Sequence, residues 1–173
     1  LKSPPGRTVL QDDNIKEGGV FPVLHCTQEI PCNPCAAVCP QGLITIDEED
    51  IRALPHFLGE RLGKACTGCE KCVTVCPGLA ITLVDTRKDA VLPLVTIPYE
   101  LDENALPLQP GRMVRVCDTL GQALGEGEVV RVKSLRSADR TKLVQLRLPA
   151  DIARHAAGIV VQEDWASEPL PDA

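Results

Sequence analysis

Short apolar runs alternate with polar, glycine- and proline-rich segments along the chain. In the first half the clearest runs are residues 43–46 and 80–84, and each predicts a short strand. Each run follows a Cys-Pro pair, and because proline cannot continue a helix, each pair is expected to end a short helical turn. Residues 48–54 predict a helical piece that Pro55 interrupts, and residues 20–25 could form an edge strand.

After about residue 90 the pattern changes to β-rich runs separated by turn residues. Gly121, Gly125 and Gly127 are expected to lie in turns, and residues 91–97 predict one strand within a proline-bracketed linker. Several short strands separated by turn residues favour a small antiparallel barrel or sandwich. The other expected strands are residues 113–117, 128–132, 143–148 and 159–161.

An internal repeat contains most of the cysteines. Residues 32–46 (CNPCAAVCPQGLITI) align without a gap with residues 69–83 (CEKCVTVCPGLAITL). Each copy has the spacing C-x2-C-x3-C-P, and one further cysteine precedes each copy. Runs of this kind hold iron–sulfur clusters, and their fourth cysteine ligates the other of two clusters. The spacing therefore predicts two 4Fe–4S clusters, one held by Cys26, Cys32, Cys35 and Cys76 and the second by Cys66, Cys69, Cys72 and Cys39.

Other uses of the cysteines remain open at this stage. Zinc also binds C-x2-C knuckles, but zinc sites usually pair two knuckles rather than three cysteines with a distant fourth. Cys26 is separated from Cys32 by five residues, which is longer than the usual spacer, so the first site could hold a 3Fe–4S cluster instead. Cys117 lies within an expected strand and is interpreted as a small buried apolar residue. His25 could tune the first cluster through a hydrogen bond, which is a lesser alternative.

Composition narrows the class of protein. Only 2% of the 173 residues are aromatic, so cluster binding is expected to contribute to folding free energy. The first residues contain no apolar signal-peptide core, no window is long and apolar enough to span a bilayer, and a reducing, cytoplasmic setting is expected. Residues 1–90 contain nine Lys or Arg against twelve Asp or Glu, whereas residues 111–154 contain nine against five. The second half could thus contact nucleic acid, but it lacks interleaved aromatic residues, and a solvated or partner-facing surface is the preferred interpretation.

Across residues 26–84 the chain resembles the bacterial two-cluster ferredoxins. The segments HCTQEIPCNPCAAVCPQGLI, CTGCEKCVTVCPGLAI and IPYE, followed by a valine-rich region, further resemble a ferredoxin-type subunit of multi-component, FAD-dependent amino-acid or amine dehydrogenases. Those complexes look related to proline, sarcosine and opine dehydrogenases, and their FAD is carried by other subunits. The resemblance implies a hetero-oligomer in which electrons pass from a partner's flavin through the clusters of this chain.

The expected fold is α+β, a two-cluster ferredoxin-like module followed by a small antiparallel β-barrel. The expected parts are an N-terminal extension (1–19), the cluster domain (20–90), a barrel or docking domain (91–163) and an acidic tail (164–173).

The expected function is electron transfer within a flavoprotein complex. No dinucleotide-binding or catalytic pattern supports a substrate-converting site, so whether the chain is itself an enzyme stays open. Two alternatives remain: a free-standing ferredoxin, and an iron–sulfur protein that regulates or binds nucleic acid.

Overall fold

The computed structural model describes residues 18–59, 61–100, 108–134 and 141–160. The predicted acidic tail and nearly all of the predicted N-terminal extension lie outside these residues. The elements are β1 (Val20–Leu24), α1 (Pro34–Val38), β2 (Ile44–Thr45), β3 (His56–Phe57), α2 (Lys71–Val75), β4 (Ile81–Asp85), β5 (Leu94–Tyr99), β6 (Met113–Cys117), β7 (Ala123–Ser134), β8 (Lys142–Arg147), α3 (Ala150–Ala153) and β9 (Gly158–Ile159).

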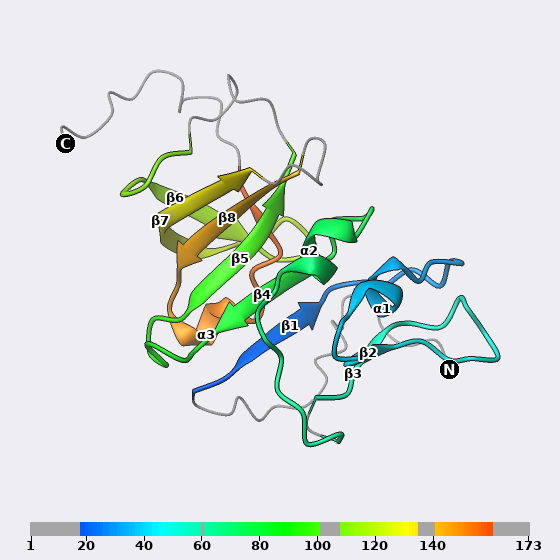
Figure 1. The fold of residues 1–173 in the computed structure, drawn as a ribbon. Coiled ribbons are helices and arrows are strands. Elements are labelled where there is room, and N and C mark those ends of the chain that lie inside the picture. The colour runs from blue at the N-terminus through cyan, green and yellow to red at the C-terminus, as the bar shows by residue number, and fades with distance from the viewer. Residues whose placement is uncertain (1–17, 60, 101–107, 135–140, 161–173) are drawn as a thin grey trace.

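Seven strands form one antiparallel sheet in the order β1-β4-β5-β8-β7-β6-β9, and β2 pairs separately with β3. Because β9 also contacts β5, the C-terminal part of the sheet curls back on itself. Figure 1 shows α1, α2 and the β2–β3 pair together at one side of this sheet, next to β1 and β4. The connection between β4 and β5 contains the boundary predicted at residue 90, and the strands on its two sides pair with each other, for example Val84 with Val95.

The sheet separates two apolar cores because successive side chains of a strand point to opposite faces. One core lies inside the curled sheet and includes Val84, Val95 and Leu146. The other lies between the sheet and the cysteine-bearing segments, and includes Ile81, Leu83 and Leu143. Both cores contain residues from both halves of the chain, so the two halves pack as one unit.

Several predicted strands are confirmed, with small differences at their ends. The strand at 113–117 is β6, residues 128–132 lie within β7, and residues 143–148 correspond to β8. Of the predicted strand at residues 20–25, Val20–Leu24 form β1, which is an edge strand as expected. The strand predicted at 91–97 begins only at Leu94, after Pro93.

Two predictions of local structure are wrong. Residues 48–54 form bends and turns rather than a helix. The carboxylate of Asp47 accepts a hydrogen bond from the backbone amide of Glu49 at 2.9 Å, and that of Asp50 accepts one from the amide of Arg52 at 3.0 Å. Such side-chain to backbone bonds compete with a helix.

Gly125 and Gly127 lie within β7 rather than in turns. At Gly127 the reason is a close approach, because a Cβ atom there would lie 2.2 Å from Cδ2 of Leu148.

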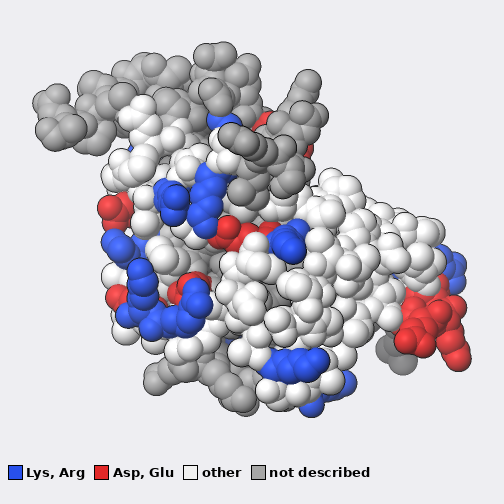
Figure 2. Space-filling model, viewed as in Figure 1, with Lys and Arg blue, Asp and Glu red and all other residues white. Residues whose placement is uncertain are grey.

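Acidic and basic side chains are unevenly distributed over the surface. Figure 2 shows a cluster of Asp and Glu side chains at one end of the molecule, whereas Lys and Arg side chains lie mainly over the C-terminal strands, with some Asp and Glu side chains among them. The four consecutive acidic residues 47–50 lie in the connection between β2 and β3, which Figure 1 places at that same end. The largest acidic cluster on the face drawn therefore lies apart from the C-terminal strands.

Candidate iron–sulfur site

The two copies of the repeat fold alike around their last cysteine. Cys39 ends α1 with φ −69° and ψ 111°, and Cys76 ends α2 with φ −69° and ψ 112°. Both conformations are extended because the next residue is proline, which disfavours helical geometry in the residue before it. A tight turn follows in each copy, in which the amide of Gly42 donates to the carbonyl of Cys39 at 3.1 Å and the amide of Leu79 donates to that of Cys76 at 3.2 Å.

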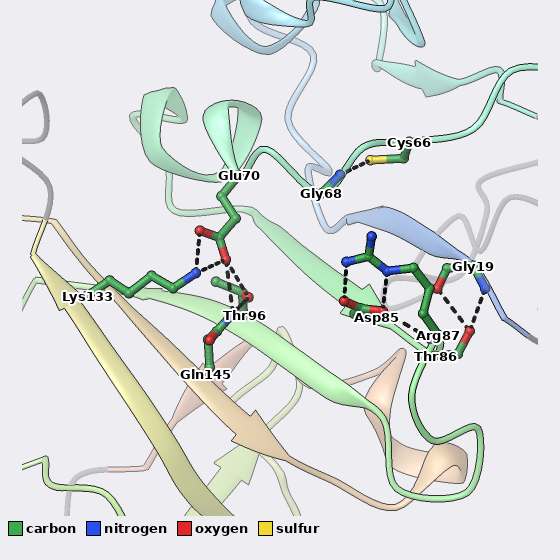
Figure 3. Close-up of polar contacts among 10 residues, drawn as sticks. All are labelled: Gly19, Cys66, Gly68, Glu70, Asp85, Thr86, Arg87, Thr96, Lys133 and Gln145. Carbon is green, nitrogen blue, oxygen red and sulfur yellow. Dashed lines mark hydrogen bonds and ion pairs between the residues drawn. The ribbon is translucent and has the colours of Figure 1, made fainter.

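Backbone amides are directed at three of the cysteine sulfurs. The amide of Leu43 lies 3.3 Å from Sγ of Cys39, and at the equivalent place in the second copy the amide of Ala80 lies 3.4 Å from Sγ of Cys76. The amide of Gly68 lies 3.4 Å from Sγ of Cys66 (Figure 3). Hydrogen bonds to sulfur stabilise a thiolate and influence the potential of a bound cluster.

One cysteine of the first copy lies with two cysteines of the second copy and with the cysteine that precedes it. Cys39, Cys66, Cys69 and Cys72 line a common pocket with an empty volume of about 370 Å³, part of which is open to solvent. Burial, together with the nearby charges of Cys66, Cys69 and Cys39, raises the pKa of Cys72 to about 12. The pKa of Cys66 is likewise raised by burial and by the charges of Cys69 and Cys39.

Conversely, Cys76 of the second copy lies near the cysteines of the first copy. Burial raises the pKa of Cys35, and the charges of Cys76 and then Cys32 add to this effect. Cys26 is placed differently, because its recorded hydrogen bond runs to the carbonyl oxygen of Gln28 in its own loop, at 3.9 Å. Among the described residues no hydrogen bond joins Cys26 to the other three cysteines of its predicted group.

The chemistry of the donor set fits a thiolate-bound cluster. In the residues that the structure describes, no three His, Cys, Asp or Glu side chains are placed to hold a single metal ion. The four thiols of the pocket instead surround a shared space, and four thiolates are the ligand set of a 4Fe–4S cluster. Cys35 and Cys72 are buried, and Cys69 is exposed.

Cys117 and His25 lie apart from these two groups. Cys117 is half-buried in β6, and burial raises its pKa. His25 is buried, and its Nε2 lies 3.0 Å from Oγ1 of Thr82 on β4, so the hydrogen bond of this nitrogen is to a hydroxyl rather than to a sulfur. Burial lowers the pKa of His25 to about 4 and so favours the neutral ring.

Sequence reasoning missed a polar cluster beside the pocket. Glu70, which also lines the pocket, receives hydrogen bonds from Thr96 on β5, Lys133 on β7 and Gln145 on β8 (Figure 3). The position of Glu70 between Cys69 and Cys72 could have drawn attention to it. Its partners could not have been found, because they are 26 to 75 residues away in the sequence.

Among the described residues, no helix has the length and apolar character needed to cross a membrane. Comparison with curated proteins and with solved structures gives no match. A protein-family model, that of the 4Fe-4S dicluster domain, matches residues 25–80. This range contains eight of the nine cysteines of the chain. Together with the pocket described above, the match identifies residues 25–80 as a ferredoxin-like, 4Fe–4S-binding domain.

Proposed function

We propose that this chain is the electron-transfer subunit of an oxidoreductase complex and that it holds two 4Fe–4S clusters crosswise. The ligands would be Cys26, Cys32, Cys35 and Cys76 for the first cluster and Cys66, Cys69, Cys72 and Cys39 for the second. The observation that carries the proposal is the shared pocket, in which Cys39 of the first copy lies with Cys66, Cys69 and Cys72. We also propose that the curled C-terminal strands form the small barrel expected from the sequence.

Each bound cluster would supply a centre that accepts and releases one electron. The residues of the chain contribute binding and insulation. Amides of Leu43, Gly68 and Ala80 support the thiolates, and buried side chains such as Val73 and Ile81 limit contact with water. Exposure of Cys69 leaves one side of the second site accessible to a partner.

Crosswise ligation can be tested by combining alanine substitutions. Cys39→Ala and Cys66→Ala should affect the same cluster, so the double variant should retain the cluster signal that each single variant retains. Cys39→Ala combined with Cys32→Ala should remove both clusters. The measurements are iron and acid-labile sulfide per chain, together with the EPR spectrum of the reduced protein.

Cys117→Ala is the matched control and should retain the full signal. If Cys39→Ala/Cys32→Ala keeps one intact cluster while Cys39→Ala/Cys66→Ala keeps none, the ligation is sequential and the proposal is wrong. A wild-type protein that contains zinc and no sulfide would contradict cluster binding altogether.

The partner that we propose is an FAD-dependent dehydrogenase subunit that oxidises an amino acid or amine. Support comes from the resemblance of the sequence and from the separation of an acidic end and a basic face, which offers two distinct docking surfaces (Figure 2). Native mass spectrometry of the protein purified from its own cells should show a stoichiometric flavoprotein. A brown monomer without flavin would favour a free-standing ferredoxin instead.

A further inference from the structure

Glu70 adopts an unusual backbone conformation at the centre of a predicted ligand loop. It lies between Cys69 and Cys72 and precedes α2 with φ 61° and ψ 5°, in the left-handed region. The equivalent residue of the first copy, Asn33, has φ −135° and ψ 13°. Residues other than glycine are disfavoured in the left-handed region, so interactions with other parts of the chain must hold Glu70 in this conformation.

The carboxylate of Glu70 does not cap α2 but points away from it toward the sheet (Figure 3). Nζ of Lys133 donates to both carboxylate oxygens at 2.8 Å. Nε2 of Gln145 and Oγ1 of Thr96 donate to Oε1, each at 3.1 Å. Three strands of the sheet therefore bind one side chain of the loop.

This cluster is largely withdrawn from solvent. The side chain of Glu70 is 12% exposed and that of Lys133 is 23% exposed. Hydrogen bonds between charged groups are stronger than neutral ones, and partial burial weakens their screening by salt. The ion pair thus differs from the exposed pair of Arg115 with Glu126, whose side chains are more than half exposed.

We propose that Lys133, with Thr96 and Gln145, is a positioning device through which the C-terminal strands fix the Cys69–Cys72 loop and set the charge beside its cluster. The second half of the chain would then help to define a redox centre whose ligands all lie in the first half. This inference rests on the proposed function for its redox part, and on the described contacts alone for its structural part.

The charges give the proposal a signature that a purely structural role would lack. Lys133→Met leaves the Glu70 carboxylate without its cation, which disfavours an added electron and should lower the potential of the nearby cluster. Glu70→Gln leaves the ammonium of Lys133 without its anion, and should raise that potential. The double variant removes both charges, so its potential should return toward that of the wild type.

The structural part is tested by hydrogen exchange of the full chain, followed by mass spectrometry. In Lys133→Met the backbone amide of Thr74, which donates to the carbonyl oxygen of Glu70 at 3.0 Å, should exchange about tenfold faster, a factor that corresponds to about 1.4 kcal/mol. Gln145→Leu, which removes a single donor, should give a smaller change in the same direction. Arg131→Met is the matched control, because it removes an exposed cation from the same strand.

Two results would overturn the proposal. One is exchange of the Thr74 amide that is no faster in Lys133→Met than in Arg131→Met. The other is a loaded protein whose potential shifts in the same direction in Lys133→Met and in Glu70→Gln. If the wild-type protein binds no cluster, the proposed function fails, and the exchange experiment still decides whether the sheet holds the loop.

Discussion

Replacing Leu143 by alanine tests whether the C-terminal strands support the cysteine loops directly. Leu143 lies on β8, is fully buried, and packs in the core that contains Cys35, Cys72 and Val73. Leu146 lies on the same strand, is also fully buried, and packs in the other core, on the opposite face of the sheet. The two leucines therefore form a matched pair that differs in the face of the sheet.

The expected loss of stability is similar for both substitutions. Leu→Ala removes three carbon atoms, which at about 0.8 kcal/mol for each buried carbon costs about 2.4 kcal/mol. The cavity that remains adds to this cost, and measured values for buried leucines in another protein range from about 2.7 to 5.0 kcal/mol. Each variant should lose about 3 kcal/mol of unfolding free energy, measured by urea denaturation of the protein under anaerobic conditions.

The local effect should distinguish the two variants. In Leu143→Ala the cavity lies in the core that contains Cys72 and Val73 of α2, so hydrogen exchange of residues 71–75 should accelerate beyond what the global loss of stability explains. In Leu146→Ala the extra acceleration should instead affect β5 and its neighbours. Equal exchange of residues 71–75 in two variants of equal stability would refute the view that Leu143 supports the loop.

Two further substitutions probe backbone packing and pH. Gly127→Ala should lower the unfolding free energy by about 1–3 kcal/mol, because the added Cβ would lie 2.2 Å from Leu148. Gly78→Ala is the control, since no atom lies nearer than 4.0 Å to the added Cβ, and it should change the unfolding free energy by less than about 0.5 kcal/mol in the same urea titration. Arg87 holds the pKa of the half-buried Asp85 below its ordinary value of 3.8. The ionised carboxylate therefore stabilises the fold above pH 3.8, and this stabilisation is lost as the pH falls through the lower pKa of the folded state. Asp85→Asn should therefore destabilise the protein at pH 7 but not at the acid end of the titration, and an equal deficit at both pH values would contradict this assignment.

Local features of this fold were predictable because they depend on neighbouring residues. The Cys-Pro pairs fix the ends of α1 and α2, and the gapless repeat predicts that both copies fold alike. The failure at residues 48–54 is also local, since Asp47 and Asp50 favour turns over the predicted helix.

Distant contacts could not be read from the pattern. The donors that bind Glu70 come from three strands, and no spacing rule relates Lys133 to a residue 63 positions earlier. Gly127 was taken for a turn residue because its role depends on Leu148, which approaches it from another part of the chain. The crosswise proximity of Cys39 to the second copy was predictable only because the cysteine spacing is itself characteristic of this type of site.

The hydrogen-bonded pairing of β4 with β5 has a consequence for how the chain can be divided. A fragment that stops near residue 90 would contain every cysteine of the dicluster region, yet it would leave one side of β4 without its neighbouring strand. Unpaired strand edges invite association between copies. The N-terminal half therefore depends on the C-terminal strands for its fold. Proteins truncated near residue 90, or fused to another protein at that point, should be expected to aggregate.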